Sequence, residues 1–263
     1  MKTLFTTLFS TTAALLTLTS FCANADIRYT AKAYSLDGHR EKLLYNYKSE
    51  SEPQGENIIV NNRFTYPDGK LASHEEITFT KDGHVTLYKQ EQAQLKATGT
   101  IEIAAGKAKF TWKRDGKEET ATEDANSDFI IGSQIPLEIA AHWEDLKKGD
   151  TMKRRLAVLE RLETVGFSFS KEGEGDVGGK KAVIIKMKPS SFLIAAVVKP
   201  LQFYMSEDGT ALYEIKGRTT VKKDENGKMS DLDADVVYTK GADLVSASAS
   251  PPTPHPTSGG NSK

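Results

Sequence analysis

The sequence predicts a mainly β fold: an antiparallel curved sheet or open β-barrel, with two short helices packed on or in its concave face. Three observations predict it. Apolar and polar residues alternate with a period of two along most of the chain, which gives each strand one buried face and one wet face. Asp-Gly and Asn-Gly pairs separate these runs and supply the positive φ angles that tight hairpins need. Two further segments follow a helical or a wholly apolar pattern instead.

The first segment in chain order, residues 1–25, has the pattern of a secretory signal peptide rather than of the fold. Lys2 gives a positive start, an apolar stretch follows, and Ala23-Asn24-Ala25 offers the small residues that a signal peptidase recognises. We therefore expect cleavage after Ala25 and a periplasmic location. A retained anchor fits less well because a stretch of about 18 residues that is rich in Thr and Ser is marginal for a membrane span. Lipidation of Cys22 fits less well because Phe21, not a small residue, precedes it.

Composition limits the function classes. The 35 basic and 36 acidic residues nearly balance, so we expect no nucleic-acid partner and no polybasic membrane segment. Cys22 is the only cysteine, so cleavage would leave neither disulfides nor thiol chemistry. No stretch after residue 25 has the roughly 18 apolar residues that a membrane-spanning helix needs. We expect no cofactor.

The strands are expected where the alternation is clearest. It is clearest at 27–34, 58–66, 95–103, 107–113, 183–188, 201–206 and 231–238. The intervening turn signals are Pro67-Asp68-Gly69, Asp82-Gly83, Asp115-Gly116, Asp208-Gly209 and Asn226-Gly227. Such hairpins predict an antiparallel sheet, because a parallel sheet needs a crossover of a dozen residues or more after each strand, for which the chain lacks room.

Two segments are expected to be helical. Residues 135–147 place Ile139, Trp143 and Leu146 on one face, with Pro136 near the start and Gly149 just past the end. Within residues 190–199, Ser190 or Ser191 can cap a short helix through the seven apolar residues 192–198, and Pro200 ends it. Each of its large side chains gains about 1.5–3 kcal/mol on burial, so protein or ligand should cover it. Residues 151–165 fit either a helix or a strand, and we favour a strand.

We expect a single β-rich domain over 26–243. Residues 244–263 are rich in proline and serine and nearly devoid of apolar residues. Such a segment buries too little surface to offset the entropy of ordering, so we expect a disordered tail.

Several short motif matches carry no chemistry. Gly173–Gly178 matches a dinucleotide-binding string, but a strand follows it, so we interpret it as an acidic hairpin loop. Ser168 and Lys171 match a serine–lysine pair, yet positions three apart on a strand face opposite sides. The run 231–235 resembles the start of a calcium loop without its glycine or its last ligand, which favours an acidic strand face. None of the five histidines has a partner at metal-ligand spacing: His39, His74, His84, His142 and His255.

The order of strands, helix, strands, apolar mini-helix and final hairpin resembles periplasmic open-barrel proteins, the group that includes the carrier of outer-membrane lipoproteins. The chain also resembles uncharacterised envelope proteins of similar length, in which a Trp-containing helix precedes an Arg-Glu-Thr strand, here Trp143 and Arg161–Thr164. The resemblance covers about 26–240 in pattern and offers no motif for transferring a functional residue. It implies an apolar cavity under the two helices.

The leading hypothesis is therefore a non-enzymatic periplasmic protein that binds or carries a lipid or a lipid-anchored molecule. The candidate ligand-binding residues are apolar: Trp143, Phe192, Leu193, Ile194, Val197, Val198 and Phe203. The same residues can simply fill a core, in which case the protein is a structural or interaction module that pairs through an edge strand. A hydrolase of envelope polymers is the third class, and the sequence lacks an activated nucleophile or a metal motif for it.

Overall fold

The computed structural model describes residues 26–196 and 198–243. The expected signal peptide, the expected tail and Val197 lie outside them. The first half of the chain is an antiparallel meander, in which each strand pairs with the next. Its strands are β1 (Asp26–Ser35), β2 (Leu43–Gln54), β3 (Asn57–Thr65), β4 (Leu71–Thr80), β5 (Val85–Gln92), β6 (Ala97–Ala104), β7 (Lys107–Arg114) and β8 (Lys117–Asp124).

The second half is a further run of strands that each pair with the next, and it carries the three α-helices of the described residues. Its strands are β9 (Phe129–Ile130), β10 (Met152–Val158), β11 (Glu163–Val177), β12 (Lys180–Pro189), β13 (Leu201–Met205), β14 (Ala211–Glu225) and β15 (Lys228–Asp243). The α-helices are α1 (Ile135–Ala141), α2 (Trp143–Lys148) and α3 (Phe192–Ala195). Short 3₁₀ turns are η1 (Ala93–Leu95), η2 (Gly132–Gln134) and η3 (Leu159–Arg161).

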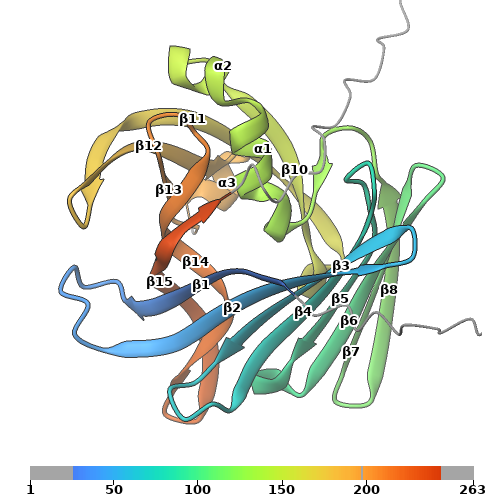
Figure 1. The fold of residues 1–263 in the computed structure, drawn as a ribbon. Helices are drawn as coiled ribbons and strands as arrows, with labels where there is room; N and C mark the ends of the chain where they lie inside the picture. The colour runs from blue at the N-terminus through green and yellow to red at the C-terminus, as the bar shows by residue number, and fades with distance from the viewer. Residues whose placement is uncertain (1–25, 197, 244–263) are drawn as a thin grey trace, which may run out of the picture.

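All fifteen strands belong to one sheet, because β1 pairs with β15 and joins the two halves of the chain. The strand order runs from β8 through β1 and β15 to β9, so β8 and β9 are the two edges. Figure 1 shows the sheet curving until its two halves face each other, with α1 and α2 between them. The predicted fold class, a curved sheet or open barrel with short helices on its concave side, is confirmed. Within the described residues, no helix is long and apolar enough to cross a membrane.

One pair of strands is parallel, which corrects the expectation of a wholly antiparallel sheet. Phe129 and Ile130 of β9 pair in parallel with Arg155 and Leu156 of β10. A parallel pair needs a long crossover, and residues 131–151, which contain α1 and α2, provide it. The two helices therefore lie on the sheet because they connect parallel neighbours.

The two sheet edges approach each other through side chains. The Arg155 Nη2 atom donates to the Asp124 carbonyl oxygen at 2.5 Å, and its Nε donates to an Asp128 carboxylate oxygen at 3.2 Å. The Thr164 hydroxyl on β11 donates to Glu123 on β8 at 2.6 Å. Hydrogen bonds that involve a charged group are stronger than neutral ones, so Arg155 holds the open barrel nearly closed.

The five predicted turns all connect neighbouring strands, with φ angles of 51° to 88° at their glycines and at Asp115 and Asn226. The ambiguous segment is a strand, β10, followed by η3 and β11, as favoured. The acidic segment Gly173–Gly178 differs from expectation, because β11 continues to Val177 and only Gly178 and Gly179 form the turn.

The two expected helices are present but differ in extent. The first is split at His142 into α1 and α2 and ends at Gly149, whose φ is 104°. The second is only the single turn of α3 rather than a helix over 192–198. Pro200 disfavours helical geometry in the residue before it, and the β-branched Val197 and Val198 have low helix propensity.

Candidate functional site

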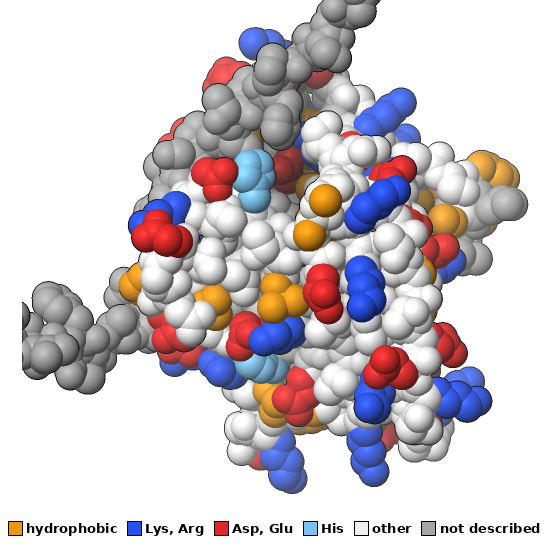
Figure 2. Space-filling model, turned by 90° about the vertical axis from the view of Figure 1, so that its right-hand side faces the viewer, with side chains coloured by type: hydrophobic (Ala, Val, Ile, Leu, Met, Phe, Trp, Pro, Cys, Tyr) orange, Lys and Arg blue, Asp and Glu red, His pale blue; other side chains and the backbone are white. Residues whose placement is uncertain are grey.

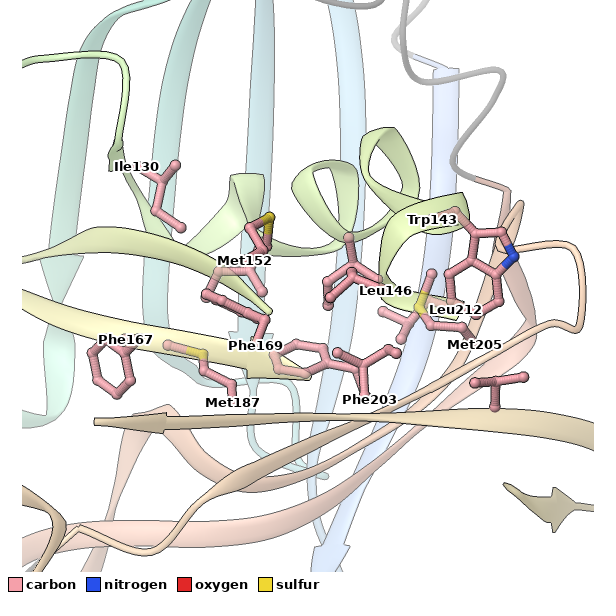
Figure 3. Close-up of a cluster of buried hydrophobic side chains, with 14 of the residues drawn as sticks. Ile130, Trp143, Leu146, Met152, Phe167, Phe169, Met187, Phe203, Met205 and Leu212 are labelled. Carbon is pink, nitrogen blue, oxygen red and sulfur yellow. The ribbon is translucent and has the colours of Figure 1, made fainter. Parts of the chain in front are cut away.

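A continuous apolar face lines the concave side of β11 to β14. Phe167 and Phe169 lie two residues apart on β11, as do Ile185 and Met187 on β12, so each pair points inward. From the opposite side, α1, α2 and the residues near them close over this face. The buried cluster comprises Ile130, Ile135, Ile139, Trp143, Leu146, Met152, Val165, Phe167, Phe169, Val183, Ile185, Met187, Phe203, Met205 and Leu212. Figure 3 shows Trp143 and Leu146 of the helical side facing Phe169, Phe203 and Met205.

Trp143 seats α2 against the β13–β14 turn. A Cβ atom on Gly209 would lie 2.3 Å from the Trp143 ring, so only glycine allows the indole to lie this close. Gly209 also has a φ of 72°, which side-chain-bearing residues rarely adopt. Trp143 is 4% exposed, and its indole N–H has no hydrogen-bond partner among the described residues. The contact between α2 and the sheet is therefore made by shape and apolar packing.

Hydrogen bonds and ion pairs hold the helical segment at the edge of the apolar cluster. The Arg154 guanidinium on β10 donates to Glu138 of α1 at 2.8 Å, and its Nη2 lies 3.0 Å from the Nε2 atom of His142. Lys147 of α2 donates to the Glu207 carbonyl oxygen at 3.0 Å. The Arg154–Glu138 pair is bidentate, with a second contact from Nη2 at 2.7 Å, and its side chains are only 15% and 17% exposed, so it links α1 to β10 more strongly than a surface ion pair would. The Lys147 contact is exposed. We call α1 and α2, residues 135–148, the lid.

The structure brings some of the candidate ligand-binding residues together. Trp143 and Phe203 belong to the buried cluster, and Ile194 of α3 packs against it. Phe192 does not, because it is 86% exposed, so the described residues leave this part of the segment uncovered. Val198 is half-buried, and Leu193 lies in α3. Val197 lies outside the described residues.

Opposite this cluster, the wall formed by β2 to β5 carries a buried polar chain that sequence reasoning missed. Ser49 donates to Asn62 at 2.8 Å, and Asn62 donates to Glu75 at 3.2 Å. The Tyr88 hydroxyl donates to the other Glu75 oxygen at 3.1 Å. Burial raises the pKa of Glu75, and within the described residues no basic side chain forms a salt bridge with it. The sequence signal for this buried polar chain is a polar residue at an inward position of each of these strands.

A pair of buried carboxylates lies beneath the β1–β2 loop. Arg40 of this loop contacts Glu214 of β14 at 2.8 Å and Asp235 of β15 at 2.7 Å. Lys216 contacts Glu214 at 3.1 Å. Burial, and then the neighbouring Asp235, raise the pKa of Glu214 to about 6. The expected acidic strand face at 231–235 is therefore largely paired, and Asp235 within it is only 2% exposed.

Two surface hollows lie away from the apolar cluster. One, of about 320 Å³, runs over β4 to β8 and is lined by residues such as His74, Lys89 and Thr100. The other, of about 500 Å³, lies among Lys96, Lys222 and neighbouring residues. Neither includes a candidate ligand-binding residue. Figure 2 shows acidic and basic side chains interspersed on the face of the molecule that it presents.

Residues 26–196 and 198–243 contain no group of three or more His, Cys, Asp or Glu side chains that could hold a metal ion. Ser168 and Lys171 lie on β11, as the strand interpretation of their motif requires.

No family model matches the chain, and no curated protein matches its sequence. Similar solved structures include a β-barrel-like protein of domain of unknown function 1849 from Brucella abortus, at 10% identity and a TM-score of 0.38, covering 80% of this chain and 92% of that one. A DUF1329 family protein from Desulfovibrio piger is similar at 10% identity and a TM-score of 0.25, covering 85% and 87%. A domain described as an outer-membrane lipoprotein-sorting protein from Vibrio parahaemolyticus is similar at 7% identity and a TM-score of 0.23, covering 81% and 82%.

Proposed function

We propose that this protein binds an acyl chain, of a lipid or of a lipid-anchored molecule, between the lid and the concave face of β11 to β14. The observation that carries the proposal is the apolar cluster itself. Four neighbouring strands present one continuous apolar face, and a segment of only 14 residues, held by packing and a few rim contacts, covers it. In this role the protein is a binding protein of the periplasm rather than an enzyme.

Binding requires the lid to move, because side chains fill the space beneath it in the described conformation. An acyl chain that replaces Trp143 and Leu146 against Phe169 and Phe203 exchanges one apolar contact for another, so the core stays dry. The apparent affinity then equals the intrinsic affinity multiplied by the open fraction, and the lid sets how readily ligand is taken up and released. Three methionines in the cluster suit this role because their side chains adapt to irregular partners: Met152, Met187 and Met205.

The two tryptophans of the chain allow a direct test. Trp143 lies in the proposed binding site, whereas Trp112 lies in a separate buried cluster formed mainly by β3 to β7. The Trp112→Phe variant therefore reports on Trp143 alone, and the matched Trp143→Phe variant reports on Trp112 alone. A brominated fatty acid quenches tryptophan fluorescence only near contact. We expect it to quench the fluorescence of Trp112→Phe saturably and to leave the fluorescence of Trp143→Phe unchanged.

Equal quenching of both variants would indicate non-specific adsorption and contradict the proposal. The absence of quenching in both would favour the second candidate, an interaction module of the envelope. The filled interior and the exposed edge strand β8 support that alternative, because most β8 side chains are exposed and its outer backbone groups can pair with another strand.

A further inference from the structure

We propose that the α3 segment, residues 190–196, docks the protein on an anionic lipid surface, with Phe192 entering the interface. This docking rests on the proposed function, and it names the surface where the ligand is exchanged. Phe192 is 86% exposed, and Leu36, at 44%, is the other exposed large hydrophobic residue among the described ones. The free energy falls when an apolar phase covers a phenyl ring that was exposed to water.

The local backbone suits an interface. Ala195 donates to the Ser191 carbonyl at 2.9 Å, Ala196 donates to Phe192 at 3.1 Å, and Val198 donates to Ile194 at 2.9 Å. The turn therefore satisfies these backbone groups internally, and a segment that enters the lipid boundary must do so. Ile194 packs inward on the apolar cluster while Phe192 points out, so the segment is anchored to the fold and presents one large apolar side chain.

Charge identifies the kind of surface. From Val177 to Ser206 the sequence holds five lysines and no acidic residue. Lys188 and Lys199 flank the segment, are exposed, and form no salt bridge with any described residue, whereas Lys186 pairs with Glu172 at 2.6 Å. Two lysines that flank an exposed aromatic residue in the sequence, and form no described salt bridge, match the phosphates and the acyl boundary of an anionic bilayer.

One phenyl ring and two lysines give weak, reversible binding, since stable anchoring needs larger apolar or polybasic signals. A carrier benefits from such weakness because it must leave the surface after loading. Ile194 also joins this segment to the cluster beneath the lid, so the docking surface lies at the border of the proposed ligand site.

The test is co-sedimentation of the mature protein, residues 26–263, with vesicles of phosphatidylglycerol and phosphatidylcholine, and with vesicles of phosphatidylcholine alone. We expect binding to the mixed vesicles, reduced about 10-fold in Phe192→Ser. The Lys188→Gln/Lys199→Gln double variant should lose about 5-fold or more, and phosphatidylcholine alone should bind weakly. Leu36→Ser is the matched control, because it removes the other exposed hydrophobic side chain and should bind as the wild type does.

Three results would overturn the inference: no binding of the wild type to mixed vesicles, equal binding of Phe192→Ser, or equal binding to both kinds of vesicle. If Phe192→Ser instead dissolves a dimer seen without vesicles, the surface is an interface between two copies, and the lipid inference is wrong. Brominated fatty-acid quenching of Trp143, measured in Phe192→Ser and Trp112→Phe combined, separates the two proposals, because Phe192 lies outside the buried cluster.

Discussion

At the level of single residues, the buried Glu214 beneath Arg40 makes the stability of the fold depend on pH. Glu214 is 1% exposed, and its pKa is raised to about 6 by burial and by Asp235. Arg40 and Lys216 contact it from the β1–β2 loop and from β14. A carboxyl that holds its proton more tightly when folded stabilises the fold while it is protonated and loses that stabilisation as the pH rises.

We predict that wild-type stability falls by up to about 2 kcal/mol relative to Glu214→Gln as the pH rises from about 4.5 to about 6. The glutamine variant keeps the shape of the side chain and cannot ionise. Urea unfolding of both proteins across this range measures the difference, and parallel stability curves would show that the pKa of Glu214 is the same in the folded and unfolded states.

Glu75 shows a limit of sequence reasoning at the same scale. Its position on β4 faces inward, where an apolar residue is expected, and its partners Asn62 and Tyr88 come from neighbouring strands. The alternation identifies the face of each strand, but it does not show which polar side chains meet across strands. That depends on register, which β-bulges shift in several pairs of this sheet.

At the scale of elements, the lid depends on one glycine. Two hairpins have the same Asp-Gly turn: Asp208-Gly209, against which Trp143 packs, and Asp82-Gly83, with open space around the glycine. Gly209 and Gly83 have φ angles of 72° and 85°, so alanine strains both backbones similarly. Only at Gly209 does the new methyl group also collide with the indole.

We predict that Gly83→Ala costs about 1–2 kcal/mol of unfolding free energy, from backbone strain alone. Gly209→Ala should cost about 1–3 kcal/mol more, because it displaces Trp143. Urea denaturation measures both, and Trp143 emission in a Trp112→Phe background should shift to the red only in the Gly209 variant. Equal costs, with unchanged emission, would mean that the lid is not seated on this turn.

The lid helices were predictable, whereas their purpose in the topology was not. The spacing of Ile139, Trp143 and Leu146 identifies a buried helical face, and Gly149 marks its end. The parallel pairing of β9 with β10 rests on two residues, Phe129 and Ile130, which are too few for a periodic signal. The exposure of Phe192 was equally hidden, because hydrophobicity in an all-apolar run does not show which side chain faces the core.

At the scale of the whole molecule, one curved sheet forms both walls, and side-chain contacts hold its two edges together. The strand alternation and the five turn signals suffice to predict a curved antiparallel sheet. The closing contacts of Arg155 with Asp124 and Asp128 join residues about 30 positions apart, so they follow from the fold rather than from local sequence. A barrel closed by side chains rather than by a complete hydrogen-bonded ladder leaves room for a helical lid over one wall.

Native mass spectrometry of the protein, purified gently from the cells that produce it, is the decisive test of whether this lid covers an acyl-chain site. We expect an adduct that organic extraction removes and identifies as an acyl-bearing lipid or a lipid-anchored molecule. A clean apo mass, together with no uptake of a fluorescent fatty acid, would contradict it and leave the filled interaction module as the better description.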